Sequence, residues 1–375
     1  MKYLKEIAKR SRECGAALLF CAVLAVAPSS SQAVTLGWDP TPGANGYKLH
    51  YGTSSSNYTS VVDAGASTTN RITGLQIGTK YYFAVSAYND FGESDYSTEI
   101  AYTVTNAPAV ISAPPSVTAN KETLQSISGV SISDADGTNG SYTLTLRASY
   151  GRVQIATSIA GGVTAGQVVG NNSTNVQVTA LLSRVNATLA ALNGVSYVGG
   201  LNFVGSDVLA LSIRDNASAQ TASSTVSVVV NGSAQDNWLT SFFRYSDLSD
   251  PTKQATVWGD TADPDADGQN NLFEFAVGLN PTNRESADAA VASSVIDVSG
   301  TKYSGLSFNR RKNPAPLQYI PEVSADKVTW TSGSGSVREN SVQSLDATFE
   351  RVNCQDLTPI TPGAPRFIRL RVVKP

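Results

Sequence analysis

Short runs of alternating apolar and polar residues, separated by turn residues, fill most of this 375-residue chain. The alternation is clear at Tyr81, Phe83, Val85 and Ala87, which would share one face of a strand because successive side chains point to opposite faces. Such runs form three blocks, at residues 34–105, 112–232 and 284–375. The pattern predicts a mainly β chain of tandem β-sandwiches with a C-terminal β domain.

One of these runs, "YKLHYG", carries the only histidine of the chain, His50. Tyr47, Leu49 and Tyr51 take the inward positions of this predicted strand, so Lys48 and His50 should face solvent. We therefore interpret His50 as a solvated strand residue and not as a catalytic one.

Between residues 235 and 283 the apolar spacing changes to that of short helices. The run "DNWLTSFFRYSDL" places Trp238, Phe242 and Tyr245 on one side of a predicted helix, and "DPTKQATVW" predicts a second. Gly278 would end a third helix. The apolar face of that third helix follows the spacing i, i+3, i+4 and i+7: Leu272, Phe275, Ala276 and Leu279.

The stretch "DPDADGQNNLFE" that leads into the third helix matches the calcium loop of EF-hands, D-x-D-x-D-G-x5-E. Calcium takes roughly six to eight oxygen ligands, which alternate side chains of a wrapped loop can supply. A glycine, Gly268, stands where such a loop turns sharply. The predicted ligands are the carboxylates of Asp263, Asp265 and Asp267, the backbone carbonyl of Gln269, Asn271 through a water, and Glu274 bidentately.

This segment contains one complete loop of this kind, and the whole chain has one methionine. Sensor EF-hands open a methionine-rich groove when they bind calcium, so we expect a structural ion and not a switch. The loop resembles the single calcium loops of dockerins and thrombospondin type 3 repeats, and that resemblance also implies a structural ion. The alternative is an acidic turn that binds no metal.

The N-terminus has the order of a signal peptide. A basic stretch, "MKYLKEIAKRSR", precedes a short apolar core, and Ser31 and Ala33 are small residues suited to cleavage after Ala33. Residues 1–33 therefore predict export to the cell surface or the medium, with no membrane span in the mature chain; an uncleaved anchor is the alternative.

The net charge of −3 and the lack of a basic stripe argue against nucleic acid as a partner.

Cleavage would remove Cys14 and Cys21 and leave Cys354 as the only cysteine. No intramolecular disulfide is then possible. Burial of Cys354 is the favoured interpretation, and a bridge between two chains is the alternative.

Two of the β blocks resemble known families. Residues 34–105 resemble a fibronectin type III domain, with Trp38 as its core tryptophan and Leu75 and Tyr81 in its tyrosine corner. Residues 106–111 read as a linker. In residues 112–232, the runs "SISDADGTNGSYTLTLRASYG", "TALLSRVNATLAALNGVSYVGG" and "GSDVLALSIRDNASAQTASSTVSVVV" resemble a bacterial cadherin-like domain. That resemblance implies a short helix in the second run and a closing hairpin in the third. It also implies calcium ligands at Asp134, Asp136 and Asn139; an acidic turn is the alternative there.

No catalytic constellation is visible. A serine or cysteine hydrolase would have only His50 as its base, and zinc sites lack their usual ligands. The stretch "ADPDADGQNNLFEFAVGLNP" is similar to the usual core of a C-terminal region of secreted proteins of environmental bacteria, which the segment from Trp238 to the end resembles. We therefore expect an exported, non-enzymatic protein that binds a cell-surface protein, a matrix or a polysaccharide. The alternative is an accessory or orphaned module of an extracellular polysaccharide-degrading system.

Overall fold

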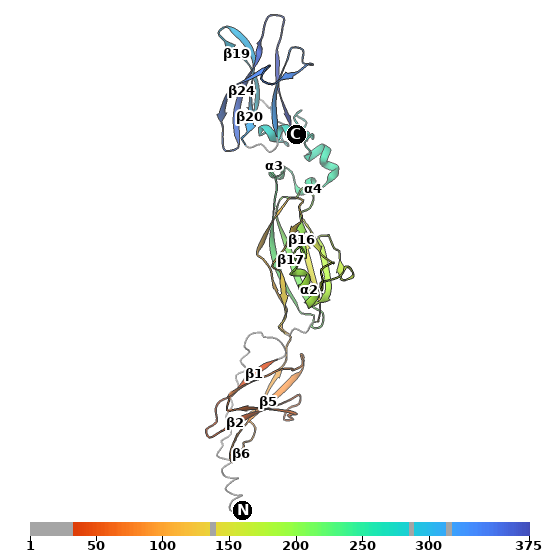
Figure 1. Cartoon of the computed structure of the whole chain (residues 1–375), viewed down its shortest axis with the longest axis vertical. Helices are drawn as coiled ribbons and strands as arrows, with labels where there is room; N and C mark the ends of the chain where they lie inside the picture. Colours follow the sequence, from red (N-terminus) through yellow and green to blue (C-terminus); the bar gives the residue numbers. More distant parts are fainter. Residues whose placement is uncertain (1–32, 136–139, 285–288, 313–316) are drawn as a thin grey trace, which may run out of the picture.

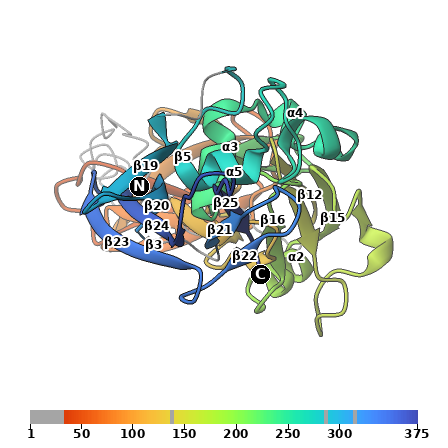
Figure 2. The same ribbon diagram turned by 90° about the horizontal axis from the view of Figure 1, so that it is seen from above.

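The computed structural model describes residues 33–135, 140–284, 289–312 and 317–375. Three β units follow one another along the long axis of the molecule (Figure 1), and they lie over one another when viewed end-on (Figure 2). The prediction of a mainly β chain with tandem sandwiches is confirmed. Outside the described residues lie most of the expected signal peptide, with Cys14 and Cys21, and two expected ligands, Asp136 and Asn139.

The first β unit packs two sheets on a core that includes Trp38, Leu75 and Phe83, all at most 5% exposed. The hydroxyl of Tyr81 accepts the backbone N–H of Gln76, as expected for a tyrosine corner. One sheet is β1 (Val34–Gly37) with β4 (Thr69–Ile72); the other orders β3 (Ser60–Gly65), β2 (Gly46–Gly52), β5 (Lys80–Asn89) and β6 (Gly92–Glu93), with β7 (Ile100–Thr103) also on β5.

His50 is buried, and its predicted exposure to solvent is wrong. It does lie on the face of β2 opposite Leu49, but aromatic rings from two loops cover that face. The Tyr96 ring lies 4.7 Å from the imidazole and the Tyr58 ring 6.3 Å, measured between centroids, and His50 is only 9% exposed. Strand alternation assigns a residue to a face, but it does not say which loops cover that face.

The second β unit packs a six-stranded sheet against smaller sheets and one helix, α2 (Leu182–Leu189). The six strands are β14 (Val168–Val169), β15 (Asn175–Leu181), β12 (Ser141–Ala148), β17 (Gly205–Asp215), β18 (Thr221–Asn231) and β9 (Ser116–Asn120). The remaining strands are β10 (Gln125–Ser126), β16 (Val195–Val198) and β13 (Arg152–Ile155) in one sheet, and β11 (Ser131–Ser133) with β8 (Val110–Ser112) in another. A 3-10 turn, η1 (Ala165–Gln167), precedes β14.

This unit begins earlier than expected. Ala109 is part of its buried core, and β8 pairs with β11, so the predicted linker 106–111 and the start at residue 112 need correction. The helix and the closing hairpin that the sequence predicted within residues 112–232 are present as α2 and as β17 with β18.

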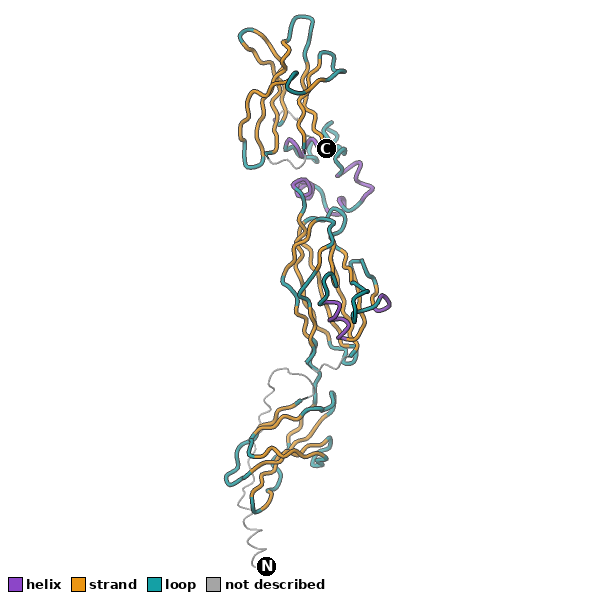
Figure 3. The backbone as a smooth tube through the Cα atoms, viewed as in Figure 1, coloured by secondary structure: helices purple, strands orange, loops and turns teal. Residues whose placement is uncertain are grey.

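The helical segment after the second β unit consists of several short pieces (Figure 3). These are α3 (Ala234–Phe242), α4 (Tyr245–Leu248), the 3-10 turn η2 (Pro251–Lys253) and the π-helical turn η3 (Gln254–Trp258). Phe243 is extended, so the single helix predicted over Trp238 and Tyr245 is wrong. The two rings point to different neighbours: Trp238 packs on Phe275, and Tyr245 packs on Phe203 of the second unit. This segment therefore contacts the β units on both sides of it.

The last helix, α5 (Asn271–Val277), packs against the C-terminal β unit. One sheet orders β19 (Val291–Val298), β20 (Thr301–Arg311), β24 (Phe349–Pro359) and β23 (Val337–Ser344); the other orders β22 (Thr331–Ser332), β21 (Gln318–Ser324) and β25 (Phe367–Val373). Phe275 and Val277 of α5 are buried in a cluster with Leu317, Leu370 and Val372. The helix that follows the acidic loop thus forms part of this core.

Candidate calcium site

The structure brings together the three aspartates at the start of the predicted calcium loop, which joins η3 to α5. Asp263, Asp265 and Asp267 each offer a carboxylate oxygen, and these three oxygens lie within 4.8 Å of one another. Within the described part of the chain this is the only group of three or more acidic, histidine or cysteine side chains arranged closely enough to hold a metal. The spacing of alternate residues therefore produces the convergence that the sequence predicted.

Backbone N–H groups shape the loop around these carboxylates. The N–H of Asp267 donates to Oδ1 of Asp263 and to Oδ1 of Asp265, both over 3.2 Å. The N–H of Gly268 donates to Oδ2 of Asp263 over 3.0 Å, and that of Gln269 donates to Oδ1 of Asp267 over 2.8 Å. Gly268 has φ of 95°, which glycine adopts without strain. The loop is thus wound around its own side chains.

Several oxygens of the loop lack the hydrogen bonds that buried polar atoms require. Among the described residues, Oδ2 of Asp265, Oδ2 of Asp267 and Oδ1 of Asn271 are buried and accept no hydrogen bond. Burial, and then the charges of Asp267 and Asp263, raise the pKa of the Asp265 carboxyl despite a hydrogen bond from the backbone of Asp267. A divalent cation would satisfy the two aspartate oxygens and offset the repulsion between the carboxylates, so these aspartates fit calcium.

Glu274 lies one turn inside α5 and is fully buried. It does not belong to the group of three converging carboxylates, and its bidentate role therefore stays a prediction. Its helix begins directly at the loop, because Oδ1 of Asn270 accepts the N–H of Phe273 over 2.9 Å and so caps the first turn.

Asn271 has a role that the sequence did not predict. Its Nδ2 donates to the carbonyls of Val257 at 2.9 Å and of Gly259 at 3.0 Å, so this fully buried side chain ties the loop to the end of η3. The backbone reinforces the connection, since the N–H of Asn271 donates to the carbonyl of Ala262. The partners are carbonyls of an irregular segment, which no sequence pattern reveals. Ligation by Asn271 through a water, and by the carbonyl of Gln269, stay predictions.

Side chains of the C-terminal sheets bind the carbonyls at the end of α5. Nε of Arg311 donates to the carbonyl of Phe275 over 2.7 Å, and the Tyr319 hydroxyl donates to that of Ala276 over 2.7 Å. The guanidinium of Arg311 also lies 3.9 Å from the centre of the Phe275 ring. The loop is therefore linked to η3 on one side and to the C-terminal core on the other.

The second expected metal site, at the start of the cadherin-like block, is only partly described. Oδ2 of Asp134 accepts the Tyr142 hydroxyl over 2.7 Å. Asp215 is the last residue of β17 and lies at the turn to β18. It accepts the N–H of Ala217 and the hydroxyl of Ser218, as an ordinary turn aspartate does. Calcium ligation by Asp134, Asp136 and Asn139 stays a prediction.

A serine, a histidine and a glutamate do meet in the first β unit. Oγ of Ser86 lies 2.8 Å from Nε2 of His50 and donates to Oε1 of Glu93 over 2.5 Å. The same Nε2 lies 3.4 Å from Glu93. In a hydrolase triad the carboxylate binds the other ring nitrogen, and the serine must reach substrate, whereas Ser86 is 1% exposed. This cluster therefore lacks the geometry of a nucleophile with its base.

Cys354 is a buried thiol, 1% exposed, on β24. Burial raises its pKa to about 12, so the reactive thiolate is scarce at neutral pH. The favoured interpretation of Cys354 as a buried residue is confirmed.

No helix among the described residues has both the length and the apolar character that crossing a membrane requires.

Comparison with known proteins identifies the first β unit. Residues 23–103 match the family model of the fibronectin type III domain. This unit is therefore a fibronectin type III domain, as Trp38 and Tyr81 predicted.

The chain is also similar to parts of other proteins. A Kelch domain-containing protein of Saccharolobus solfataricus is 37% identical over 93 residues, which are 25% of this chain and 12% of that protein's length. A solved Fn3-like protein from Clostridium thermocellum shares 27% identity over 25% of this chain and 98% of its own, with a TM-score of 0.21. The FN5 domain of Drosophila Lar shares 23% identity over 24% of this chain and 92% of its own, with a TM-score of 0.20.

Proposed function

We propose that this chain is an exported, non-enzymatic multi-domain β protein that binds a cell-surface protein, a matrix or a polysaccharide, and that calcium in the loop 263–274 is part of its structure. The observation that carries the calcium proposal is the convergence of Asp263, Asp265 and Asp267, two of which have buried oxygens without a hydrogen-bond donor among the described residues.

Binding rather than catalysis is supported by the kind of modules present. The fibronectin type III domain is a β-sandwich that serves as a binding or structural module. The one histidine, His50, is held with Ser86 and Glu93 beneath two tyrosine rings and is only 9% exposed, which does not favour a role as a catalytic base. An elongated series of β units is suited to presenting surfaces at a distance (Figure 1).

Asp263, Asp265 and Asp267 would hold the ion, with Glu274 entering from α5. The ion would supply positive charge where the carboxylates otherwise repel one another. Extracellular modules bind calcium with dissociation constants of about 10⁻⁴ to 10⁻³ M. At a calcium concentration about a hundredfold above that constant, binding would add roughly 2.7 kcal/mol to the stability of the unit that holds it.

The stabilisation would reach beyond the loop. Asn271 ties the loop to the carbonyls of Val257 and Gly259, while Arg311 and Tyr319 tie α5 to the C-terminal sheets. Calcium would therefore strengthen the connection between η3 and the C-terminal β unit, and leave the distant fibronectin type III domain unchanged.

Retention on a surface tests the binding function. Purified protein, in calcium or in EGTA, would be incubated with cellulose, chitin, xylan and surfaces coated with extracellular-matrix proteins. We expect retention on at least one of them and no release of sugar. Retention on none, or turnover that a single carboxylate or serine substitution abolishes, would overturn the proposed function.

A further inference from the structure

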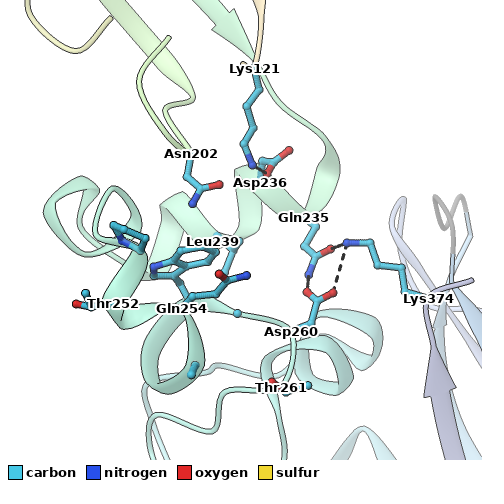
Figure 4. A pocket seen from close by; sticks show the side chains of 14 residues that line it. Lys121, Asn202, Gln235, Asp236, Leu239, Thr252, Gln254, Asp260, Thr261 and Lys374 are labelled. Carbon is cyan, nitrogen blue, oxygen red and sulfur yellow. Dashed lines mark hydrogen bonds and ion pairs between the residues drawn. The ribbon is translucent and has the colours of Figure 1, made fainter. Parts of the chain in front are cut away.

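A pocket of about 630 Å³ lies between the helical segment and the β units on either side of it (Figure 4). Lys121 and Asn202 reach it from the second β unit, and Lys374 from the C-terminal unit. The rest of its wall comes from α3, η2, η3 and the residues up to Thr261. Its volume is in the range of about 300 to 1,000 Å³ that small-molecule sites occupy.

The charged groups of this pocket neutralise one another. Nζ of Lys121 lies 2.6 Å from Oδ1 of Asp236, and Nζ of Lys374 lies 3.5 Å from Oδ2 of Asp260. Gln235 joins the second pair, because its Nε2 donates to Asp260 and its Oε1 accepts from Lys374. The lining therefore holds two ammonium groups and two carboxylates, already paired, and offers no excess charge to an ionic ligand.

The remaining wall combines amide and hydroxyl groups with apolar surface. Asn202 and Gln254 carry amides, which both donate and accept hydrogen bonds. Nδ2 of Asn202 already donates to the carbonyl of Leu248 over 2.9 Å, which fixes this amide at the pocket wall and leaves its oxygen and its second N–H for a ligand. Trp258 and Leu239 are only partly buried and supply apolar surface. The indole N–H of Trp258 donates to the carbonyl of Asp250 over 3.1 Å, which fixes the orientation of the ring.

Part of this wall is held in place by the acidic loop. Gly259 and Asp260 line the pocket and stand directly before the loop, and the side chain of Asn271 binds the carbonyl of Gly259. A side chain at Gly259 would lie 2.4 Å from the carbonyl oxygen of Gln254, so the backbone approaches too closely for any other residue. The wall that carries Trp258 and Gln254 is thus formed before a ligand arrives.

We infer that this pocket binds a neutral oligosaccharide. A sugar presents hydroxyls that both donate and accept, which match the amides of Asn202 and Gln254, and a C–H face that packs on an aromatic ring such as that of Trp258. The absence of excess charge in the lining disfavours an anionic sugar or a nucleotide. This inference rests on the proposed function, because it assigns polysaccharide binding, one form of that function, to this pocket.

Calorimetric titration of the full chain tests the inference. The probes are cellohexaose, xylohexaose and mannohexaose, with hexagalacturonate as the anionic comparison. We expect one neutral hexasaccharide to bind. Gln254→Ala should weaken its binding about two- to tenfold, the range that one lost hydrogen bond gives. Trp258→Phe should weaken it as well. Gln343→Ala, an exposed glutamine on β23, and Trp330→Phe are the matched controls and should bind as the parent chain does.

The outcomes separate this inference from the proposed function. If all four variants bind a neutral hexasaccharide equally, the sugar binds elsewhere; the pocket inference then fails while the proposed function stands. Preference for hexagalacturonate, or heat from none of the neutral probes, also overturns the inference, whereas retention on surfaces reports on the function independently. Because Gln254 is exposed, its variant should fold, and circular dichroism would verify this for both pocket variants.

Discussion

Lys121 and Asp236 join the second β unit to the helical segment, with 2.6 Å between Nζ and Oδ1 and both side chains less than a quarter exposed. The same carboxylate accepts the N–H and the hydroxyl of Ser233 and so completes the N-terminal cap of α3. Burial raises the pKa of Asp236, but the hydrogen bonds from Lys121 and Ser233 outweigh it, and the pKa is lowered overall. One side chain thus both starts a helix and fixes it to its neighbour.

Replacing Asp236 should therefore loosen this junction. Asp236→Ala removes the carboxylate half of the capping box and leaves Lys121 without this partner, and we expect a loss of about 2 kcal/mol in the free energy of unfolding. Urea denaturation measures it. Asp95→Ala, on an exposed loop of the fibronectin type III domain, is the control. A loss no greater than that of the control would contradict the prediction.

Calcium removal should destabilise the C-terminal β unit selectively. We expect EGTA to lower its melting temperature in scanning calorimetry and to leave the fibronectin type III transition unchanged. Asp265→Ala and Glu274→Gln should reproduce the effect of EGTA and abolish the response to calcium. Identical melting in calcium and in EGTA would favour the acidic turn without metal.

Acid should weaken the C-terminal unit through Glu322, which is 6% exposed and lies between Arg369 and Arg371. Burial alone would raise the pKa of Glu322, but hydrogen bonds from Arg371 and Arg369 outweigh burial and lower that pKa below its ordinary value. Because the folded pKa is the lower one, this stabilisation is present above the unfolded pKa and is lost as the pH falls through the folded pKa.

Stability of the C-terminal unit, measured by urea denaturation between neutral pH and pH values below the folded pKa, should therefore fall in acid. Glu322→Gln should reduce that slope. A variant whose pH dependence matches that of the parent chain would show that Glu322 does not contribute.

A buried carboxylate should dominate the stability of the second β unit. Asp207 is 1% exposed and accepts the Tyr197 hydroxyl over 2.8 Å. It also accepts the backbone N–H groups of Ser149, Tyr150, Gly151 and Val208. Asp207→Ala would leave these donors unsatisfied, and we expect a loss of about 3 to 5 kcal/mol in chemical denaturation. Asp207→Asn keeps part of the acceptor and should cost less; equal losses would contradict this account.

Export can be tested at the N-terminus. Protein recovered outside the cytoplasm should begin at or near Val34 when sequenced by Edman degradation. Recovery of intact Met1 only, from the cytoplasm, would exclude the predicted cleavage.

The sequence by itself determined the features that depend on local spacing. Alternation placed Phe83, Val85 and Ala87 in the first core, because the two faces of a strand differ only in residue parity. In the same way, the positions of Asp263, Asp265 and Asp267 were enough to predict their convergence, since a short loop that turns at Gly268 brings alternate side chains together.

Only the tertiary structure decided the features that depend on neighbours distant in the chain. His50 lies on the face of β2 that strand alternation predicts, opposite Leu49, and it is still buried, because Tyr58 and Tyr96 cover that face. Trp238 and Tyr245 contact different β units, because the chain leaves the helix between them. A local pattern specifies which way a side chain points, but burial and partners depend on the segments that pack there, and these are brought together only by the fold.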